Sequence, residues 1–175
     1  GNIGIGHVRY PTAGSESVSE SQPFYVNSPY GLSIVHNGNL VNAEQLTKEL
    51  YKDNYRHLNT SSDSEVILNV FAHELQQASS FNPTPEQIFK AVEKTHLRLQ
   101  GAYSVLLMIS GVGLVGIRDP KGIRPLILGK KDNDLIGSDY MIASESPALS
   151  ALEFEIEGDL KPGEAVFITL DGEIH

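Results

Sequence analysis

Three short polar clusters in the sequence carry side chains that could bind or transform a small molecule. The first is HVRYPTAG at residues 7–14, where Arg9 ends an apolar run and small residues follow. A guanidinium can hold a carboxylate or phosphate through two parallel hydrogen bonds, and a loop of small residues can close over the bound anion. The segment therefore predicts an anion site at Arg9. The alternative is a surface arginine at the end of a strand.

The second cluster is His36-Asn37-Gly38-Asn39, directly after the apolar run GLSIVH. A sharp turn here would expose the Asn37 amide beside the N–H of Gly38, and two such donors can stabilise a developing negative oxygen. Asn-Gly is also the commonest pair in two-residue hairpin turns, and this simpler interpretation is favoured when the residues are considered alone. The next segment looks helical rather than like a partner strand, so the oxyanion-hole interpretation stays open.

The third cluster is TSSDSE at residues 60–65. Its hydroxyls and acids are typical of the start of a helix, where they cap free N–H groups and oppose the helix dipole. One cap needs fewer such groups than are present, so Asp63 could be free to bind an ammonium group. The six histidines show no metal-ligand spacing, and His7 and His36 are interpreted as structural.

The composition excludes several classes of function. The 175 residues carry 13 Lys and Arg against 22 Asp and Glu, a net charge of -9, which disfavours nucleic-acid and membrane partners. No apolar run approaches the roughly 18 residues of a membrane span, and the first residues do not resemble a signal peptide. A cytoplasmic protein is expected. With no cysteine, the chain contains no thiolate metal site and no cysteine nucleophile.

The order of the predicted elements indicates an α+β fold with mainly antiparallel sheets. Helices are expected after Asn42, after Ser62 as far as about Ala78, and after Thr84, with Thr84 and Gln87 forming a capping box. A short helix is expected at 146–152 and a solvated charged loop at 130–134. Strands are expected at 1–10, 22–27, 31–36, 102–109, 112–118, 123–129, 139–144, 154–160 and 164–170.

Both ends of the sequence suggest that the domain is truncated. Residues 1–10 read as a buried strand with no turn before it. Asp171-Gly172 opens a hairpin of which only a short second strand, ending at His175, remains. We therefore expect a fragment of a larger protein.

The three clusters, in this order, resemble the glutaminase domain of class II glutamine amidotransferases, which are N-terminal-nucleophile hydrolases. RDPKGIRPLILG at 118–129, together with ASES and PGEAVFI, narrows the resemblance to the branch that makes 5-phosphoribosylamine from phosphoribosylpyrophosphate in the first step of de novo purine biosynthesis. The resemblance runs nearly from Gly1 to His175. It implies a four-layer αββα sandwich, with 1–175 as a partial glutaminase domain and a pentosyltransferase domain after residue 175.

The resemblance also implies a role for each candidate residue. Arg9 would hold the α-carboxylate of L-glutamine, assisted by Thr12, and Asp63 would pair with its α-amino group. Asn37 and Gly38 would form the oxyanion hole. Residues 9–20 would correspond to the loop that closes over glutamine in this family.

The nucleophile of the family is missing from this sequence. In the family it is an N-terminal cysteine whose own amino group serves as the base, and we expect it to precede residue 1. The chain alone is therefore predicted to be inactive, with no cofactor in this segment. Mg²⁺ and phosphoribosylpyrophosphate would bind the domain after residue 175, and a homo-oligomer is expected for the full-length protein.

The sequence leaves two alternatives open. One is the glutaminase domain of glucosamine-6-phosphate synthase, in which the arginine motif usually has Trp after Arg and His after Thr. Tyr10 and Ala13 differ from that pattern. The other is a non-catalytic module that binds an amino acid. A cysteine at the mature N-terminus would support an enzyme.

Overall fold

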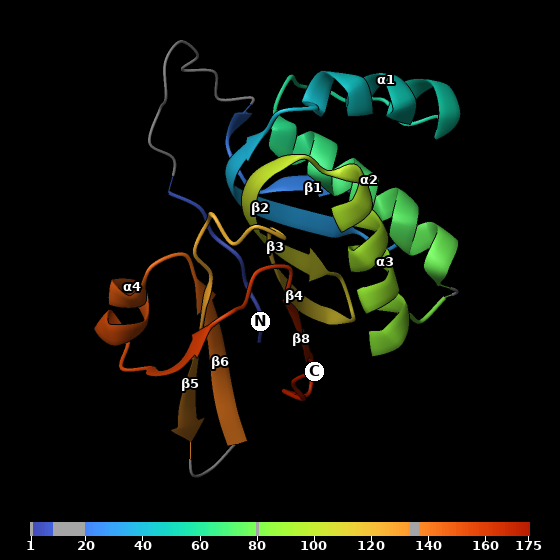
Figure 1. Cartoon of the computed structure of the whole chain (residues 1–175). Helices are drawn as coiled ribbons and strands as arrows, with labels where there is room; N and C mark the ends of the chain where they lie inside the picture. Colours follow the sequence, from blue (N-terminus) through green and yellow to red (C-terminus); the bar gives the residue numbers. More distant parts are fainter. Residues whose placement is uncertain (1, 9–19, 80, 134–136) are drawn as a thin grey trace.

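Two antiparallel sheets lie face to face in the computed structural model, which describes residues 2–8, 20–79, 81–133 and 137–175 (Figure 1). The larger sheet has the order β1-β2-β3-β4-β8 and the smaller one the order β6-β5-β7. The elements are β1 (Phe24–Val26), β2 (Leu32–Leu40), α1 (Ala43–Asp53), α2 (Asp63–Ala78), α3 (Pro85–Arg98), β3 (Gly101–Ile109), β4 (Gly113–Arg118), β5 (Ile127–Asn133), β6 (Gly137–Ala143), α4 (Ser146–Ala151), β7 (Glu155–Asp159) and β8 (Ala165–Thr169). The predicted α+β class is confirmed.

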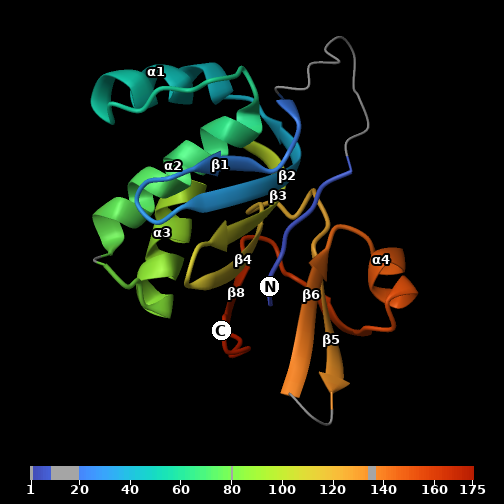
Figure 2. The ribbon, with the colours of Figure 1, turned by 180° about the vertical axis from the view of Figure 1, so that it is seen from behind.

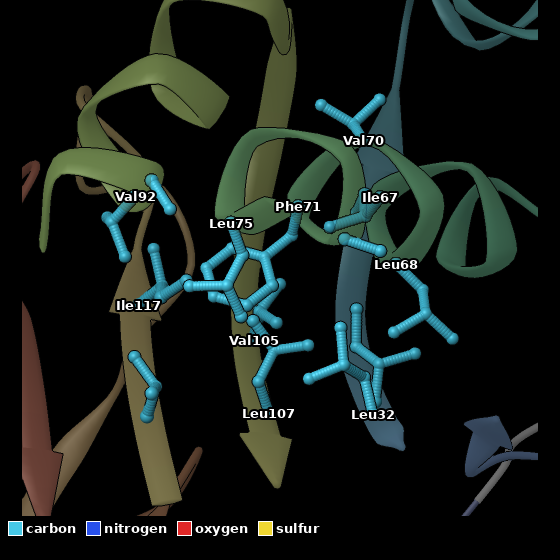
Figure 3. Packing of buried hydrophobic residues seen from close by; sticks show 14 of the residues in the cluster. Leu32, Ile67, Leu68, Val70, Phe71, Leu75, Val92, Val105, Leu107 and Ile117 are labelled. Carbon is cyan, nitrogen blue, oxygen red and sulfur yellow. The ribbon is translucent and has the colours of Figure 1, made fainter. Parts of the chain in front are cut away.

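The first hydrophobic core lies between the larger sheet and the helices α1, α2 and α3, which cover one of its faces (Figures 1 and 2). Helix α2 lies closest to the sheet, and its side chains Phe71 and Leu75 meet Val105 and Leu107 of β3 (Figure 3). All four are almost completely buried. Burial of this apolar surface is the main force that holds the helices on the sheet.

A second core joins the two sheets. Leu114, Val166 and Ile168 of the larger sheet belong to one buried cluster with Ile142 of the smaller sheet. Gly116 allows the close approach, since a Cβ there would lie 3.0 Å from Ile142 Cδ1. The two faces of the larger sheet therefore serve two separate cores.

Helix α4 forms the fourth layer. Leu128 of β5 points into the second core, whereas a Cβ on the next residue, Gly129, would lie 2.9 Å from Leu149 of α4. Because successive strand residues point to opposite faces, α4 covers the outer face of the smaller sheet. The expected αββα layer order is confirmed by this arrangement and by the structural relatives given below.

Several expected elements differ from the structure. The strand expected at 123–129 begins only at Ile127, because the N–H groups of Ile123 and Arg124 bond to the Asp119 carboxylate instead of to a strand. Residues 2–8 form no strand; Ile3 and Ile5 pack against the second core, and Val8 is 97% exposed. The expected charged loop is wrong as far as Asn133, because β5 runs through Lys130 and pairs with β6 there. Its charges stay at the surface, and Lys130 forms an ion pair with Asp132 at 2.8 Å.

All three predicted helix starts are confirmed, and a side-chain cap is present at two of them. Ser62 accepts a hydrogen bond from the N–H of Ser64, and Thr84 forms the capping box with Gln87. Asn42 does precede α1, but its side chain donates to the carbonyl of Arg98 at 2.9 Å instead of capping the helix. No helix in the described ranges is long and apolar enough to cross a bilayer.

Two charged side chains fix the turn after β4: Asp119, which is buried, and Arg118, which is half-buried. The Asp119 carboxylate is completely buried and accepts three hydrogen bonds, at 2.9–3.3 Å, from backbone N–H groups within residues 121–124. Arg118 donates to three carbonyl oxygens, two of them at 2.8 Å. The segment RDPKGIRP thus keeps its shape through its own side chains.

We expect Asp119→Ala to lower the free energy of unfolding by about 3 kcal/mol, because it leaves several backbone N–H groups without an acceptor. Urea denaturation would measure the loss. Asp139→Ala, which changes an exposed residue of β6, is the matched control and should cost less than about 0.5 kcal/mol. Equal stability of the two variants would contradict a structural role for Asp119.

Candidate active site

Asn37 and Gly38 lie within strand β2, so the expected turn at this position is wrong. They pair with Ser104 and Tyr103 of β3, and the pairing continues as far as Leu40. The reason for the glycine is close approach of β3: Gly38 has φ +150°, and a Cβ there would lie 2.1 Å from the carbonyl oxygen of Ala102. A local Asn-Gly pair is here part of an extended strand.

The register of β2 determines where its N–H groups point. The N–H of Val41 donates at 2.8 Å to the carbonyl of Gln100, the residue just before β3, so it points toward β3. Hydrogen-bonded and non-hydrogen-bonded pairs alternate in an antiparallel ladder, so odd-numbered residues of β2 bond to β3. The N–H groups of His36, Gly38 and Leu40 point to the opposite edge.

Side chains rather than a strand cover that opposite edge beyond β1. Strand β1 pairs with β2 only as far as Ile34 of β2. The N–H of His36 donates to Oε1 of Gln22 at 2.6 Å, and the N–H of Leu40 donates to Oδ2 of Asp63 at 3.0 Å. The N–H of Gly38 lies between these two bonds, on a part of the edge that no described strand covers.

Asp63, the first residue of α2, is held close to this edge. Its Oδ1 lies 3.6 Å from Nδ1 of His36, and the same ring nitrogen lies 3.1 Å from Oγ of Ser64. Burial raises the pKa of Asp63, but His36 and the backbone N–H groups of Leu40 and Ser64 outweigh it, so the pKa is lowered overall. The carboxylate is 23% exposed and can accept a further hydrogen bond from a ligand.

Asn37 points away from Asp63's helix, to the face shared with the smaller sheet. Directly paired residues share a face, so Asn37 projects on the same side as Ser104 and Arg118. Residues 2–8 also run on this side, as the packing of Ile3 on the second core shows. The segment that leads to Arg9 therefore approaches on the face of Asn37.

Three of the five predicted site residues lie close together in the structure. Asn37 and Gly38 are neighbours on β2, and Asp63 bonds to Leu40 of the same strand. Arg9 and Thr12 lie outside the described residues, so their roles stay predictions. Two surface grooves among the described residues, one along α1 and one beside β1, are lined by neither Asn37, Gly38 nor Asp63.

Two further residues support the site and were not predicted. Gln22 binds His36, and no local sequence pattern marks it. Glu65 is buried and accepts four hydrogen bonds from Asn59 and Thr60, which fixes the loop before α2. The excess of acids in TSSDSE was the available signal for Glu65. In the part of the chain that the structure describes, no group of three or more His, Asp or Glu could hold a metal ion.

Comparison with known proteins gives matches over the whole chain. The chain is 58% identical over 175 residues to the amidophosphoribosyltransferase of Pseudomonas aeruginosa and 54% identical over 174 residues to that of Escherichia coli. These alignments cover 100% and 99% of this chain but 35% and 34% of those proteins. The chain thus spans about a third of the length of the curated relatives it matches.

The fold has relatives among solved structures. The glutamine phosphoribosylpyrophosphate amidotransferase of Bacillus subtilis, complexed with ADP and GMP, superposes with a TM-score of 0.73 at 29% identity. The superposition covers 97% of this chain and 33% of that one. A model of the glutamine amidotransferase domain matches residues 7–151, well over half of the sequence. The chain therefore belongs to the glutamine amidotransferase family.

Proposed function

We propose that this chain is the glutamine-hydrolysing domain of an amidophosphoribosyltransferase. In this proposal the ammonia released from glutamine displaces pyrophosphate from phosphoribosylpyrophosphate and gives 5-phosphoribosylamine, the first step of de novo purine biosynthesis. Identities of 58% and 54% to two enzymes of that name support it. They also favour it over the glucosamine-6-phosphate synthase alternative.

The observation that carries the proposal is the N–H of Gly38, which points to an edge of β2 that no described strand covers, beside the Asn37 side chain. A thiolate that attacks the glutamine carboxamide places negative charge on the carboxamide oxygen. Two fixed donors directed at that oxygen stabilise it more in the transition state than in the ground state. Collapse of the intermediate breaks the C–N bond as the nitrogen takes up the proton that the thiol gave to the α-amino group of the N-terminal cysteine. Ammonia leaves and a thioester remains, which water hydrolyses to glutamate and the free thiol.

The spacing of Gly38 and Asp63 suits glutamine as the substrate. Asp63 is bonded to Leu40, two residues beyond Gly38 on β2. Two strand residues span about 6.6 Å. An extended glutamine can bridge this interval, with its carboxamide at Gly38 and its α-ammonium at the ionised Asp63. Arg9 and Thr12 would hold the α-carboxylate.

Several parts of the proposal lie outside these 175 residues. The nucleophile is assigned to a cysteine that this sequence does not contain. Phosphoribosylpyrophosphate and Mg²⁺ are assigned to a phosphoribosyltransferase domain beyond residue 175. A homo-oligomer and a cytoplasmic location stay predictions.

We expect Asn37→Ala, in the full-length protein, to lower kcat for glutamine hydrolysis by about 100-fold with little change in KM, as loss of an oxyanion donor does. Synthesis from free ammonia should be unchanged, because it bypasses glutamine. Steady-state assays with each nitrogen source measure both. Asn82→Ala, at an exposed residue between α2 and α3, is the control. A wild-type protein without any glutaminase activity would instead support the non-catalytic module.

A further inference from the structure

Gln22 lies where the pairing of β1 with β2 would continue by one more hydrogen-bonded pair. Continuation of the β1–β2 register, in which Phe24 lies opposite Ile34, puts residue 22 opposite His36. The bonds are made by the side chain: Oε1 accepts from the N–H of His36 at 2.6 Å, and Nε2 donates to the carbonyl of His36 at 3.2 Å. A carboxamide carries the same donor and acceptor as a peptide group, so it can replace a strand residue.

This replacement ends the strand pairing one step before Gly38. If the backbone of residue 22 paired with His36, the next pair in the register would bring residue 20 opposite Gly38, and its carbonyl would take the Gly38 N–H. Because the Gln22 side chain makes the bonds, the backbone of this segment stays further from β2. The N–H of Gly38 is thereby kept available for a substrate oxygen.

Gln22 also fixes the peptide plane that precedes Asn37. The carbonyl of His36, which accepts from Nε2 of Gln22, belongs to the peptide bond between His36 and Asn37. A rotation of that plane would move the Asn37 side chain. On the other side of the site, the Asp63 carboxylate accepts a hydrogen bond from the N–H of Leu40. The candidate donors therefore lie on a stretch of strand held at both ends.

We propose that Gln22 is a positioning residue for the oxyanion hole. It holds the strand on which Asn37 and Gly38 lie, and it prevents the backbone of its own segment from taking the Gly38 N–H. The inference rests on the proposed glutaminase function and adds a residue that the family resemblance did not include.

The test is Gln22→Met in the full-length protein, which removes both hydrogen bonds and keeps a side chain of similar length. We expect kcat for glutamine hydrolysis to fall about tenfold, less than for loss of a donor itself, and KM to change less than about twofold. Rates are divided by the number of sites that react with an electrophilic glutamine analogue, so misfolded protein does not count. Gln77→Met, at an exposed position of α2, is the matched control.

Gln22→Glu provides a second, nearly isosteric variant. Its ionised carboxylate accepts from the N–H of His36 but cannot donate to the His36 carbonyl, and it adds negative charge beside the oxyanion. A protonated carboxyl again offers one donor and one acceptor. We expect activity relative to wild type to rise as the pH falls toward the ordinary glutamic acid pKa of about 4.3. The rate is again counted per reactive site, so a purely structural role, which would change the number of sites and not the rate of each, would not produce this rise.

The outcomes separate this inference from the proposed function. If wild type hydrolyses glutamine and Asn37→Ala lowers kcat, but Gln22→Met leaves the rate per reactive site unchanged, the positioning role is wrong and the proposed function stands. An equal fall in ammonia-dependent synthesis would also overturn the positioning role, since the defect would be global. If wild type shows no glutaminase activity, the proposed function itself fails.

Discussion

Replacing Gly38 with alanine is expected to damage both the fold and the activity. The residue has φ +150°, and a Cβ would lie 2.1 Å from the carbonyl oxygen of Ala102 and 2.8 Å from Cα of Tyr103. Both contacts are with backbone, so β3 must move. We expect the free energy of unfolding to fall by about 3 kcal/mol or more. Glutaminase activity should fall below about 1% of wild type, because the displaced strand carries the oxyanion donors. Urea denaturation and steady-state assays test the two effects.

Gly111→Ala is the matched control for this prediction. Gly111 also has a positive φ, +75°, but a Cβ there would meet nothing within 4 Å. It lies in the β3–β4 hairpin, at the other end of β3 from Tyr103. The free energy of unfolding of this variant should fall by only about 1–2 kcal/mol, the cost of placing a residue with a Cβ at positive φ. Its activity should be that of wild type. Equal losses in the two variants would contradict the close-approach explanation.

Asp63→Asn is expected to lower kcat/KM for glutamine about 100-fold, with most of the change in KM. The amide keeps the size of the side chain, and its oxygen can still accept from the N–H of Leu40, so the strand anchor survives. What is lost is the negative charge that pairs with the α-ammonium of glutamine, and charged partners in enclosed sites contribute several kcal/mol. Initial rates over a range of glutamine concentrations provide kcat and KM separately.

The pH dependence of this effect has a definite sign. Because the folded state lowers the pKa of Asp63, its stabilising contribution is present above the unfolded value of 3.8 and is lost as the pH falls through the folded pKa. Between pH 5 and 8 the carboxylate stays ionised, so the defect of Asp63→Asn should be constant there. Asp53→Asn, at an exposed position of α1, should change neither constant. A defect confined to kcat would point away from ammonium binding.

Elements defined by local patterns could be predicted from the sequence. The apolar stripe of α2 and the Thr84 capping box of α3 are set by residues within one or two turns. The Asp171-Gly172 hairpin is confirmed as well, since the N–H of Thr169 donates to the carbonyl of Glu173 at 2.9 Å. In each case the signal and the structure lie within a few residues of each other.

Features decided by distant pairing could not be predicted in this way. The Asn37-Gly38 pair reads locally as a turn, but β3, more than 60 residues later, extends it into a strand. Gln22 acquires its role only through the register of β1 on β2, which no single segment encodes. Asp63 was proposed as a ligand, and its bond to Leu40 depends on how α2 lies against the sheet.

The alternation along β2 makes the site sensitive to changes in chain length as well as in chemistry. His36 faces the helices, Asn37 faces the smaller sheet, and the N–H of Gly38 points to the edge of β2 that no described strand covers. An insertion of one residue between Leu32 and His36 would exchange these directions and turn the Asn37 amide toward the helix-side core. Such an insertion would act as an active-site mutation although every candidate residue were still present. An insertion in the hairpin at Ser110-Gly111, between β3 and β4, would leave the directions of the β2 residues unchanged.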